Sequence, residues 1–243
     1  MSVELRLGDP REARRGAGPT ALQVKPDAPL FTHLDPPSFA AEQYRSLAVQ
    51  VEDRIASRAV GSGYLLAVTS AEEKAGKTLT ALNLSLALAR GGEHRVLLVE
   101  ADLWRAGLQP YFTASWPRGR GLTQVLDREL SLAQAILPVT DSGLHILPSG
   151  ATTRLGDVLS GRRLTDLFDE LRRSFEVVVL DTPPFPLLSS SRAISGRADG
   201  VVLVVRSGQS RRSGIENIVR ALGAPKIVGL LLNGARVRFQ SYY

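Results

Sequence analysis

Uninterrupted apolar runs alternate with amphipathic stretches from about residue 37 to residue 233. Strands that are apolar throughout are typical of a parallel sheet covered on both faces, and the stretches between them place apolar residues at helical spacing. The pattern predicts strands over 64–70, 95–101, 144–148, 175–181, 200–206 and 226–233. It predicts helices from Ser38 toward Arg58 and over 77–90, 163–173 and 211–222, with helical material over 121–137. We therefore expect an α/β fold, a doubly wound, mostly parallel sheet flanked by helices.

The chain divides into three regions. Residues 1–36 are rich in Arg, Gly, Pro and Ala without a sustained period, which predicts a flexible basic leader. Residues 37–235 form one domain that opens with a helix, for which Ser38 is the candidate N-cap, and residues 236–243 form a C-terminal tail. A hydrophobic content of 44% in 243 residues is enough for the core of one large domain.

The clearest chemical signal is the loop Ala71-Glu72-Glu73-Lys74-Ala75-Gly76-Lys77-Thr78, between a predicted strand and a predicted helix. A Gly-Lys-Thr turn at this place holds the phosphates of a nucleotide: backbone N–H groups face the anion, Lys77 reaches the β and γ phosphates, and the hydroxyl of Thr78 binds Mg²⁺. The loop has Ala71 where the template has glycine. We expect ATP to contact Ala71, Glu72, Glu73, Lys74, Ala75, Gly76, Lys77, Thr78 and Leu79.

Two further predicted strands end in acids. One runs into Glu100-Ala101-Asp102 and the other into Asp181-Thr182-Pro183-Pro184. An acid directly after a buried strand is costly unless it is solvated, paired or meets a cation. Because the carboxyl ends of parallel strands share one edge of the sheet, these acids converge on the phosphate loop. They indicate a P-loop NTPase-like domain in which Asp181 has the Walker B position.

The order of these motifs resembles the bacterial tyrosine kinases (BY-kinases) of capsule and exopolysaccharide biosynthesis, relatives of the septum-site and partition ATPases. The resemblance covers about residues 36–243 and includes Glu42-Gln43-Tyr44-Arg45-Ser46-Leu47, Leu147-Pro148-Ser149-Gly150 and Ala198-Asp199-Gly200. It implies an ATP-dependent tyrosine autokinase. Lys77 would neutralise phosphate charge, Thr78 and Asp181 would hold Mg²⁺, Glu100 would support the water shell of the metal, and Asp102 would orient or deprotonate the tyrosine hydroxyl.

Other residues matching the family extend these expectations. Tyr242 and Tyr243 resemble a short version of the terminal tyrosine cluster that neighbouring subunits phosphorylate. Glu42 and Arg45 match an assembly motif of the family, whose last arginine is Ala48 here, and they imply a homo-oligomer. Asn233 is a candidate for reading the adenine edge, or else a loop residue that closes a turn.

Two departures from the family pattern leave other functions open. Lys74 replaces a loop glycine, and Glu100 stands where the family has aspartate. Both, together with the short tail, favour an alternative, a catalytically weak ATP-binding regulatory subunit. A partition-type ATPase acting on DNA or membrane is the second alternative, but Glu72 stands where that class has its signature lysine.

Composition and charge limit the expected partners and location of the protein. The formal net charge is +6, yet the arginines are scattered without interleaved aromatic residues, so we expect no nucleic-acid partner. The chain has no cysteine, no apolar signal-peptide core and no run long enough to span a bilayer. We expect a cytoplasmic protein. The resemblance implies that a polysaccharide co-polymerase-type membrane protein holds it at the inner face of the plasma membrane and activates it.

Overall fold

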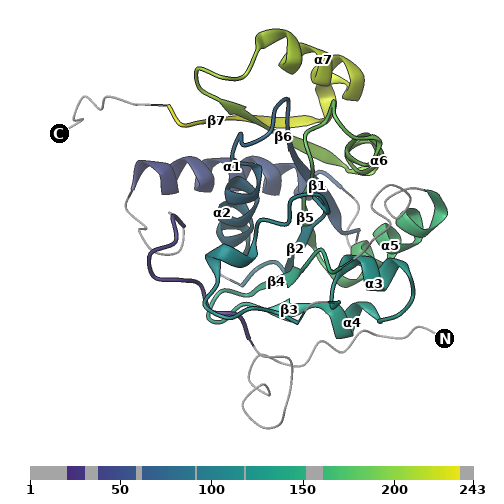
Figure 1. The fold of residues 1–243 in the computed structure, drawn as a ribbon. Coiled ribbons are helices and arrows are strands. Elements are labelled where there is room, and N and C mark those ends of the chain that lie inside the picture. The colour runs from purple at the N-terminus through teal and green to yellow at the C-terminus, as the bar shows by residue number, and fades with distance from the viewer. Residues whose placement is uncertain are drawn as a thin grey trace.

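A seven-stranded sheet in the order β3-β4-β2-β5-β1-β6-β7 forms the centre of the molecule (Figure 1). The computed structural model describes residues 21–30, 38–58, 62–90, 92–117, 119–151 and 161–235. All neighbouring strands are parallel except β3 and β4, which pair antiparallel. The strands are β1 (Tyr64–Ser70), β2 (Val96–Glu100), β3 (Leu137–Pro138), β4 (Leu144–Leu147), β5 (Val177–Asp181), β6 (Gly200–Arg206) and β7 (Ile227–Asn233).

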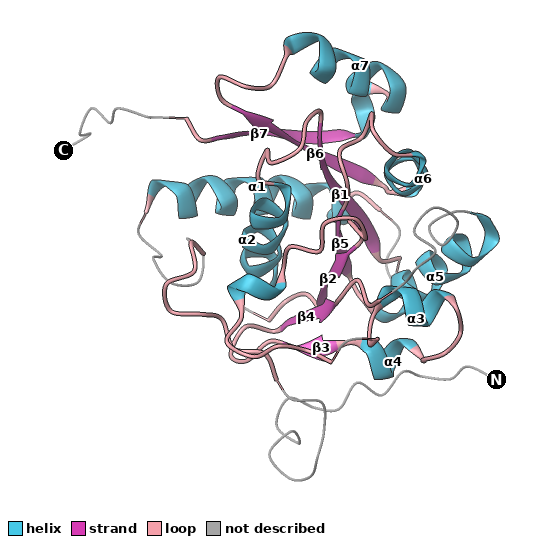
Figure 2. Ribbon diagram, viewed as in Figure 1, coloured by secondary structure: helices cyan, strands magenta, loops and turns pink. Residues whose placement is uncertain are grey.

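Helices cover both faces of this sheet (Figure 2). On one face, α1 (Phe39–Ala56) and α2 (Lys77–Ala89) pack on side chains such as Leu66 and Val179. On the other face, residues such as Leu97 and Val178 meet four helices, α3 (Leu122–Leu126), α4 (Leu132–Ala135), α5 (Gly161–Ser174) and α6 (Ser189–Arg197). Helix α7 (Arg212–Leu222) packs beside β6, and two 3₁₀ turns lie at Gln109–Tyr111 and Ala224–Lys226. The expected doubly wound architecture is confirmed.

Most predicted elements agree with the observed ones within about two residues at their ends. The helical material predicted over 121–137 is instead two short helices, α3 and α4, and residue 137 lies in β3. The sequence pattern does not predict the strand β3, because it is two residues long and contains Pro138. Helix α6 was also missed, since its sequence Ser-Ser-Ser-Arg-Ala-Ile-Ser-Gly-Arg is serine-rich and offers little apolar periodicity. The predicted N-cap is confirmed, because the side chain of Ser38 accepts a hydrogen bond from the backbone N–H of Ala41.

Residues 21–30 differ from the flexible leader that the sequence predicts. Leu22 and Leu30 are fully buried in the core that α1 and α2 cover. The backbone N–H of Leu22 donates to the carbonyl of Pro138, and its own carbonyl accepts from the N–H of Thr140, so this segment adds to the sheet edge at β3. The apolar residues are too few and too widely spaced for a sequence pattern to reveal this packing. Residues 1–20 and 31–37 lie outside the described residues.

Candidate nucleotide-binding site

The loop between β1 and α2 curls around the start of α2 at the carboxyl edge of the sheet. Two of its residues have left-handed backbone conformations, Lys74 with φ 58° and Gly76 with φ 100°. A side chain at position 76 would collide with Asn233, because a Cβ there would lie 1.9 Å from the Nδ2 of that residue. The Nδ2 of Asn233 donates to the carbonyl oxygen of Ala75 at 2.8 Å. The last strand of the sheet therefore supports the backbone of the phosphate loop.

Lys77 is the first residue of α2 and is only 7% exposed. Burial lowers the pKa of its ammonium, and the nearby carboxylates of Asp181, Asp102 and Glu73 oppose that shift. Thr78 follows it in the first helical turn, where backbone N–H groups have no partner within the helix. An ammonium, a hydroxyl and open backbone donors at a helix N-terminus form a site for a phosphate group.

Asp181, the last residue of β5, is completely buried, and neither of its carboxylate oxygens has a hydrogen-bond partner of good geometry among the described residues. Burial raises its pKa to about 7, although the Thr78 hydroxyl and the Lys77 ammonium are near enough to lower it. A buried carboxylate without a partner is costly, and a hard divalent cation is the usual compensation. Thr78 and Asp181 thus suit Mg²⁺, while the described residues contain no group of three or more acidic, histidine or cysteine side chains arranged to hold a metal.

Glu100, the last residue of β2, is also fully buried but is well satisfied. Its Oε1 accepts from the backbone N–H of Leu108 at 2.8 Å, and its Oε2 accepts from the N–H of Ser149 at 3.0 Å. The side chain therefore joins the loop after β2 to the segment after β4. Both of its oxygens therefore already hold backbone groups. The role of Glu100 in the water shell of the metal stays a prediction.

Asp102 lies in the loop after β2 and is 6% exposed. Burial raises its pKa, while the ammonium of Lys77 and backbone N–H groups of Arg105 and Trp104 oppose the shift. The guanidinium of Arg105 pairs with Glu73 of the phosphate loop at 2.8 Å. The loop after β2 also passes close to Thr78, since a Cβ at Gly107 would lie 3.2 Å from the hydroxyl oxygen of Thr78.

The structure thus brings Lys77, Thr78, Asp102 and Asp181 together at one edge of the sheet. Arg105 has no role in the sequence predictions. Its position three residues after Asp102, in the same loop, could have indicated that it lies at the site. Asn233 lies at the site, where its amide contacts the phosphate loop, and its adenine-reading role stays a prediction. Tyr242 and Tyr243 lie outside the described residues.

The two predicted assembly residues lie away from these side chains, on α1. Glu42 and Arg45 pair with each other at 2.8 Å on the surface of that helix. Their role in assembly stays a prediction. None of the helices in the described segments is both long and apolar enough to cross a membrane.

Comparison with known proteins identifies the family of the chain. The AAA domain family matches residues 65–226. The tyrosine-protein kinase YwqD of Bacillus subtilis (strain 168) is 30% identical over 212 residues, which are 86% of this chain and 87% of that protein. The succinoglycan biosynthesis transport protein ExoP of Rhizobium meliloti (strain 1021) is 28% identical over 204 residues, covering 82% of this chain and 25% of that protein.

Solved structures give the same result for the fold. The kinase domain of the Escherichia coli tyrosine kinase ETK superposes with a TM-score of 0.77 at 23% identity, covering 90% of this chain and 85% of that one. A fold of this kind, with a phosphate loop and acids at the carboxyl ends of the strands, defines a P-loop ATPase-like domain. Within that class, the chain belongs to the bacterial tyrosine-protein kinase family.

Proposed function

We propose that this chain is an ATP-dependent protein-tyrosine autokinase that regulates the synthesis and export of a capsular polysaccharide or exopolysaccharide. The observation that carries the proposal is the buried, unpartnered carboxylate of Asp181, which lies near the ammonium of Lys77 and the hydroxyl of Thr78. This arrangement suits a phosphate chain with its magnesium ion. Membership of the tyrosine-kinase family supports the same reaction.

In this reaction, the residues of the chain mainly position groups and neutralise charge. Lys77 and the first turn of α2 bind the β and γ phosphates. Thr78 and Asp181 would hold Mg²⁺, which would supply positive charge against the phosphate oxygens. Asp102 accepts the proton of the tyrosine hydroxyl while the tyrosine oxygen bonds to the γ-phosphorus. The bond from that phosphorus to the β–γ bridging oxygen breaks, and ADP leaves. A pKa of Asp102 raised by burial makes this carboxylate a better base.

The acceptors in this proposal are Tyr242 and Tyr243, in the tail directly after the described residues. Phosphorylation adds a charge of about −1.5 to −2 per tyrosine, which Glu100, Asp102 and Asp181 would repel, so a modified tail would leave the site. Each tail would enter the site of a neighbouring copy, and Glu42 and Arg45 on α1 are the residues proposed to join the copies. The exposure of that ion pair makes it accessible to a second subunit.

The proposed partner is a polysaccharide co-polymerase-type membrane protein, which would bring the chain to the inner face of the plasma membrane. The relative ExoP supports this idea, because its matching segment is a quarter of a longer protein named for transport in succinoglycan biosynthesis. Which polymer this chain serves would follow from that partner.

The test is to incubate the purified protein with Mg·ATP and the membrane activator and to map phosphotyrosine by mass spectrometry. We expect modification at Tyr242 or Tyr243, with an initial rate that rises faster than linearly with protein concentration. The Lys77→Ala variant should neither bind ATP nor become phosphorylated, and the double variant Tyr242→Phe, Tyr243→Phe should lose the signal. ATP turnover without tyrosine modification would contradict the proposal.

A second candidate function is a catalytically weak, ATP-binding regulatory subunit. The left-handed backbone of Lys74 favours it, since a residue with a Cβ costs about 1 kcal/mol there relative to glycine. In that case nucleotide-dependent assembly, rather than phosphoryl transfer, is the activity to measure. Binding of Mg·ATP with no phosphotyrosine in the presence of the activator would favour this candidate.

A further inference from the structure

A loop that binds phosphates carries two adjacent acids, Glu72 and Glu73, although each would repel the ligand. The structure gives each acid a different environment. Glu73 pairs with Arg105 at the rim of the site, where the two side chains are 45% and 56% exposed. Glu72 turns in another direction, toward the connection between β6 and α7, and its side chain is half-buried.

The carboxylate of Glu72 is held by two donors from that connection. The hydroxyl of Ser210 donates to its Oε2 at 2.7 Å, and the backbone N–H of Arg211 donates to its Oε1 at 3.1 Å. Arg211 precedes the first residue of α7, so Glu72 satisfies a donor at the start of a helix that has no side-chain cap of its own. Ser210 is itself held, since its oxygen accepts from the backbone N–H of Arg206 at 2.9 Å.

A close approach of the backbone supports these contacts. A Cβ added at Gly214, in the first turn of α7, would lie 3.1 Å from the Cβ of Ala71 and 3.6 Å from Oε1 of Glu72. The first turn of α7 therefore packs directly on the phosphate loop. From the other side, the carbonyl of Glu72 accepts from the hydroxyl of Ser70 at 2.5 Å, which holds the backbone of the same residue.

We propose that Glu72 is a positioning residue, which fixes the phosphate loop in its binding conformation by latching it to Ser210 and Arg211 at the start of α7. The proposal rests on the proposed function, because it concerns the same ATP site. The loop needs this support because Lys74 holds a left-handed conformation that its side chain disfavours. Prior organisation of a binding loop lowers the cost of ordering it when the ligand arrives.

The latch and a simple charge effect predict opposite changes in Mg·ATP affinity when Glu72 is replaced. If Glu72 acted only through its charge, its removal would tighten binding of the phosphates. If it acts as a latch, the Glu72→Ala variant should bind Mg·ATP about tenfold more weakly, because two hydrogen bonds to a carboxylate are lost. Glu72→Gln keeps an oxygen that can accept from Arg211 and should retain most of the affinity. Glu73→Ala is the matched charge control and should bind Mg·ATP at least as tightly as the wild type.

The experiment measures Mg·ATP affinity by calorimetry on the full chain, with Lys77→Ala as the reference for a lost site. Ser210→Ala should weaken binding about threefold, and the double variant Glu72→Ala, Ser210→Ala should lose no more than Glu72→Ala alone, since both remove one latch. The Michaelis constant for ATP should rise in proportion, while the turnover number at saturating ATP stays near that of the wild type. A purely structural defect would instead lower the melting temperature without this pattern.

Wild-type affinity in Glu72→Ala, or losses that multiply in the double variant, would overturn the latch while leaving the proposed function intact. If Glu72→Ala does not fold, Ser210→Ala and Glu72→Gln carry the same test, and unchanged affinity in Ser210→Ala together with tighter binding in Glu72→Gln would overturn the latch. Wild-type protein that binds no Mg·ATP would overturn both proposals.

Discussion

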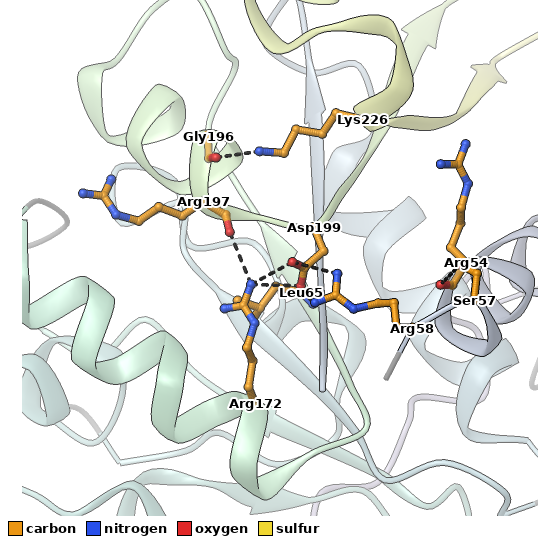
Figure 3. A network of polar contacts seen from close by, with 9 residues as sticks. All are labelled: Arg54, Ser57, Arg58, Leu65, Arg172, Gly196, Arg197, Asp199 and Lys226. Carbon is orange, nitrogen blue, oxygen red and sulfur yellow. Dashed lines mark hydrogen bonds and ion pairs between the residues drawn. The ribbon is translucent and has the colours of Figure 1, made fainter. Parts of the chain in front are cut away.

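At the amino ends of the strands, the carboxylate of Asp199 accepts a hydrogen bond from the backbone N–H of Leu65 at 2.9 Å. It also forms ion pairs with Arg172 at 2.9 Å and with Arg58 at 3.0 Å (Figure 3). At the carboxyl ends of the same sheet, Asp181 is more deeply buried, and its oxygens have no hydrogen-bond partner of good geometry among the described residues. Both are aspartates next to a buried strand. They differ in whether the fold itself compensates their charge.

This difference assigns Asp199 to the stability of the fold and Asp181 to ligand binding. The Asp199 network joins the end of α1, the end of α5 and the starts of β1 and β6, so the protein alone satisfies it (Figure 3). Lys226 adds a further link nearby by donating to the carbonyl of Gly196 at 2.5 Å. The carboxyl ends instead keep Asp181 and Lys77 buried with part of their charge uncompensated, which lowers stability but leaves groups free for a ligand. The following changes test this division.

The largest effect on stability is expected for Asp199→Ala. The change leaves the N–H of Leu65 without its acceptor and removes the partner of two arginines, which should lower the free energy of unfolding by about 2–3 kcal/mol. Urea denaturation measures it, and Asp199→Asn, which keeps an acceptor for Leu65, is the control and should lose about half as much. Mg·ATP affinity of the folded variant should equal that of the wild type. A large loss of affinity would show that the amino ends also serve the site.

The reverse result is expected for Asp181→Asn, which keeps the shape of the side chain and removes its charge. Autophosphorylation should fall at least tenfold and should require more Mg²⁺. Without nucleotide and Mg²⁺ the variant should melt no lower than the wild type, because an uncompensated buried carboxylate is gone. Kinase assays over a Mg²⁺ series and thermal melts measure both. Normal activity at low Mg²⁺ would make Asp181 a structural acid.

A smaller effect is expected for Glu100→Asp, which introduces the aspartate that the resemblance implies at this position. Glu100 bridges the N–H groups of Leu108 and Ser149, and an aspartate is one methylene too short to reach both. Leaving one buried N–H unpaired should cost about 1 kcal/mol of stability and lower the activity. Glu100→Gln is the comparison variant: it keeps the length of the side chain, but its amide has only one accepting oxygen, so it too leaves one N–H unpaired and should lose a similar amount of stability. Higher activity in Glu100→Asp would show that the metal, not the two loops, sets the requirement, and would support the weak-catalyst alternative.

The comparison also explains what could be predicted from sequence. Lys77, Thr78, Asp102 and Asp181 were predictable together, because parallel strands bring their carboxyl ends to one edge. The partners of Glu100 are backbone groups, and any residue can supply them, so no side-chain pattern reveals them. The contact between Glu72 and Ser210 spans 138 positions and depends on how closely α7 approaches the loop. Likewise, nothing in the composition of residues 21–30 shows that Leu22 and Leu30 enter the core.

The smallest expected effect concerns an exposed ion pair at the amino ends of β2 and β5. Arg95 donates to Glu176 from its side chain at 2.8 Å and from its backbone N–H at 2.7 Å. Burial alone would raise the pKa of Glu176, but the hydrogen bonds from Arg95 together lower it below its ordinary value.

Because the pKa of Glu176 is lower in the folded state than in the unfolded state, the pair stabilises the fold fully above the ordinary glutamate pKa of about 4.3. This contribution is lost as the pH falls through the lowered value. The two side chains are 56% and 40% exposed, so solvent screening limits the effect to about 0.5 kcal/mol. Urea titrations of the wild type and Glu176→Gln should differ by a constant amount from about pH 7 to pH 5 and converge in more acidic solution. A Glu176→Gln variant that is more stable than the wild type at pH 7, with the gap closing in acid, would mean that the charge of Glu176 is uncompensated, as that of Asp181 is at the opposite edge.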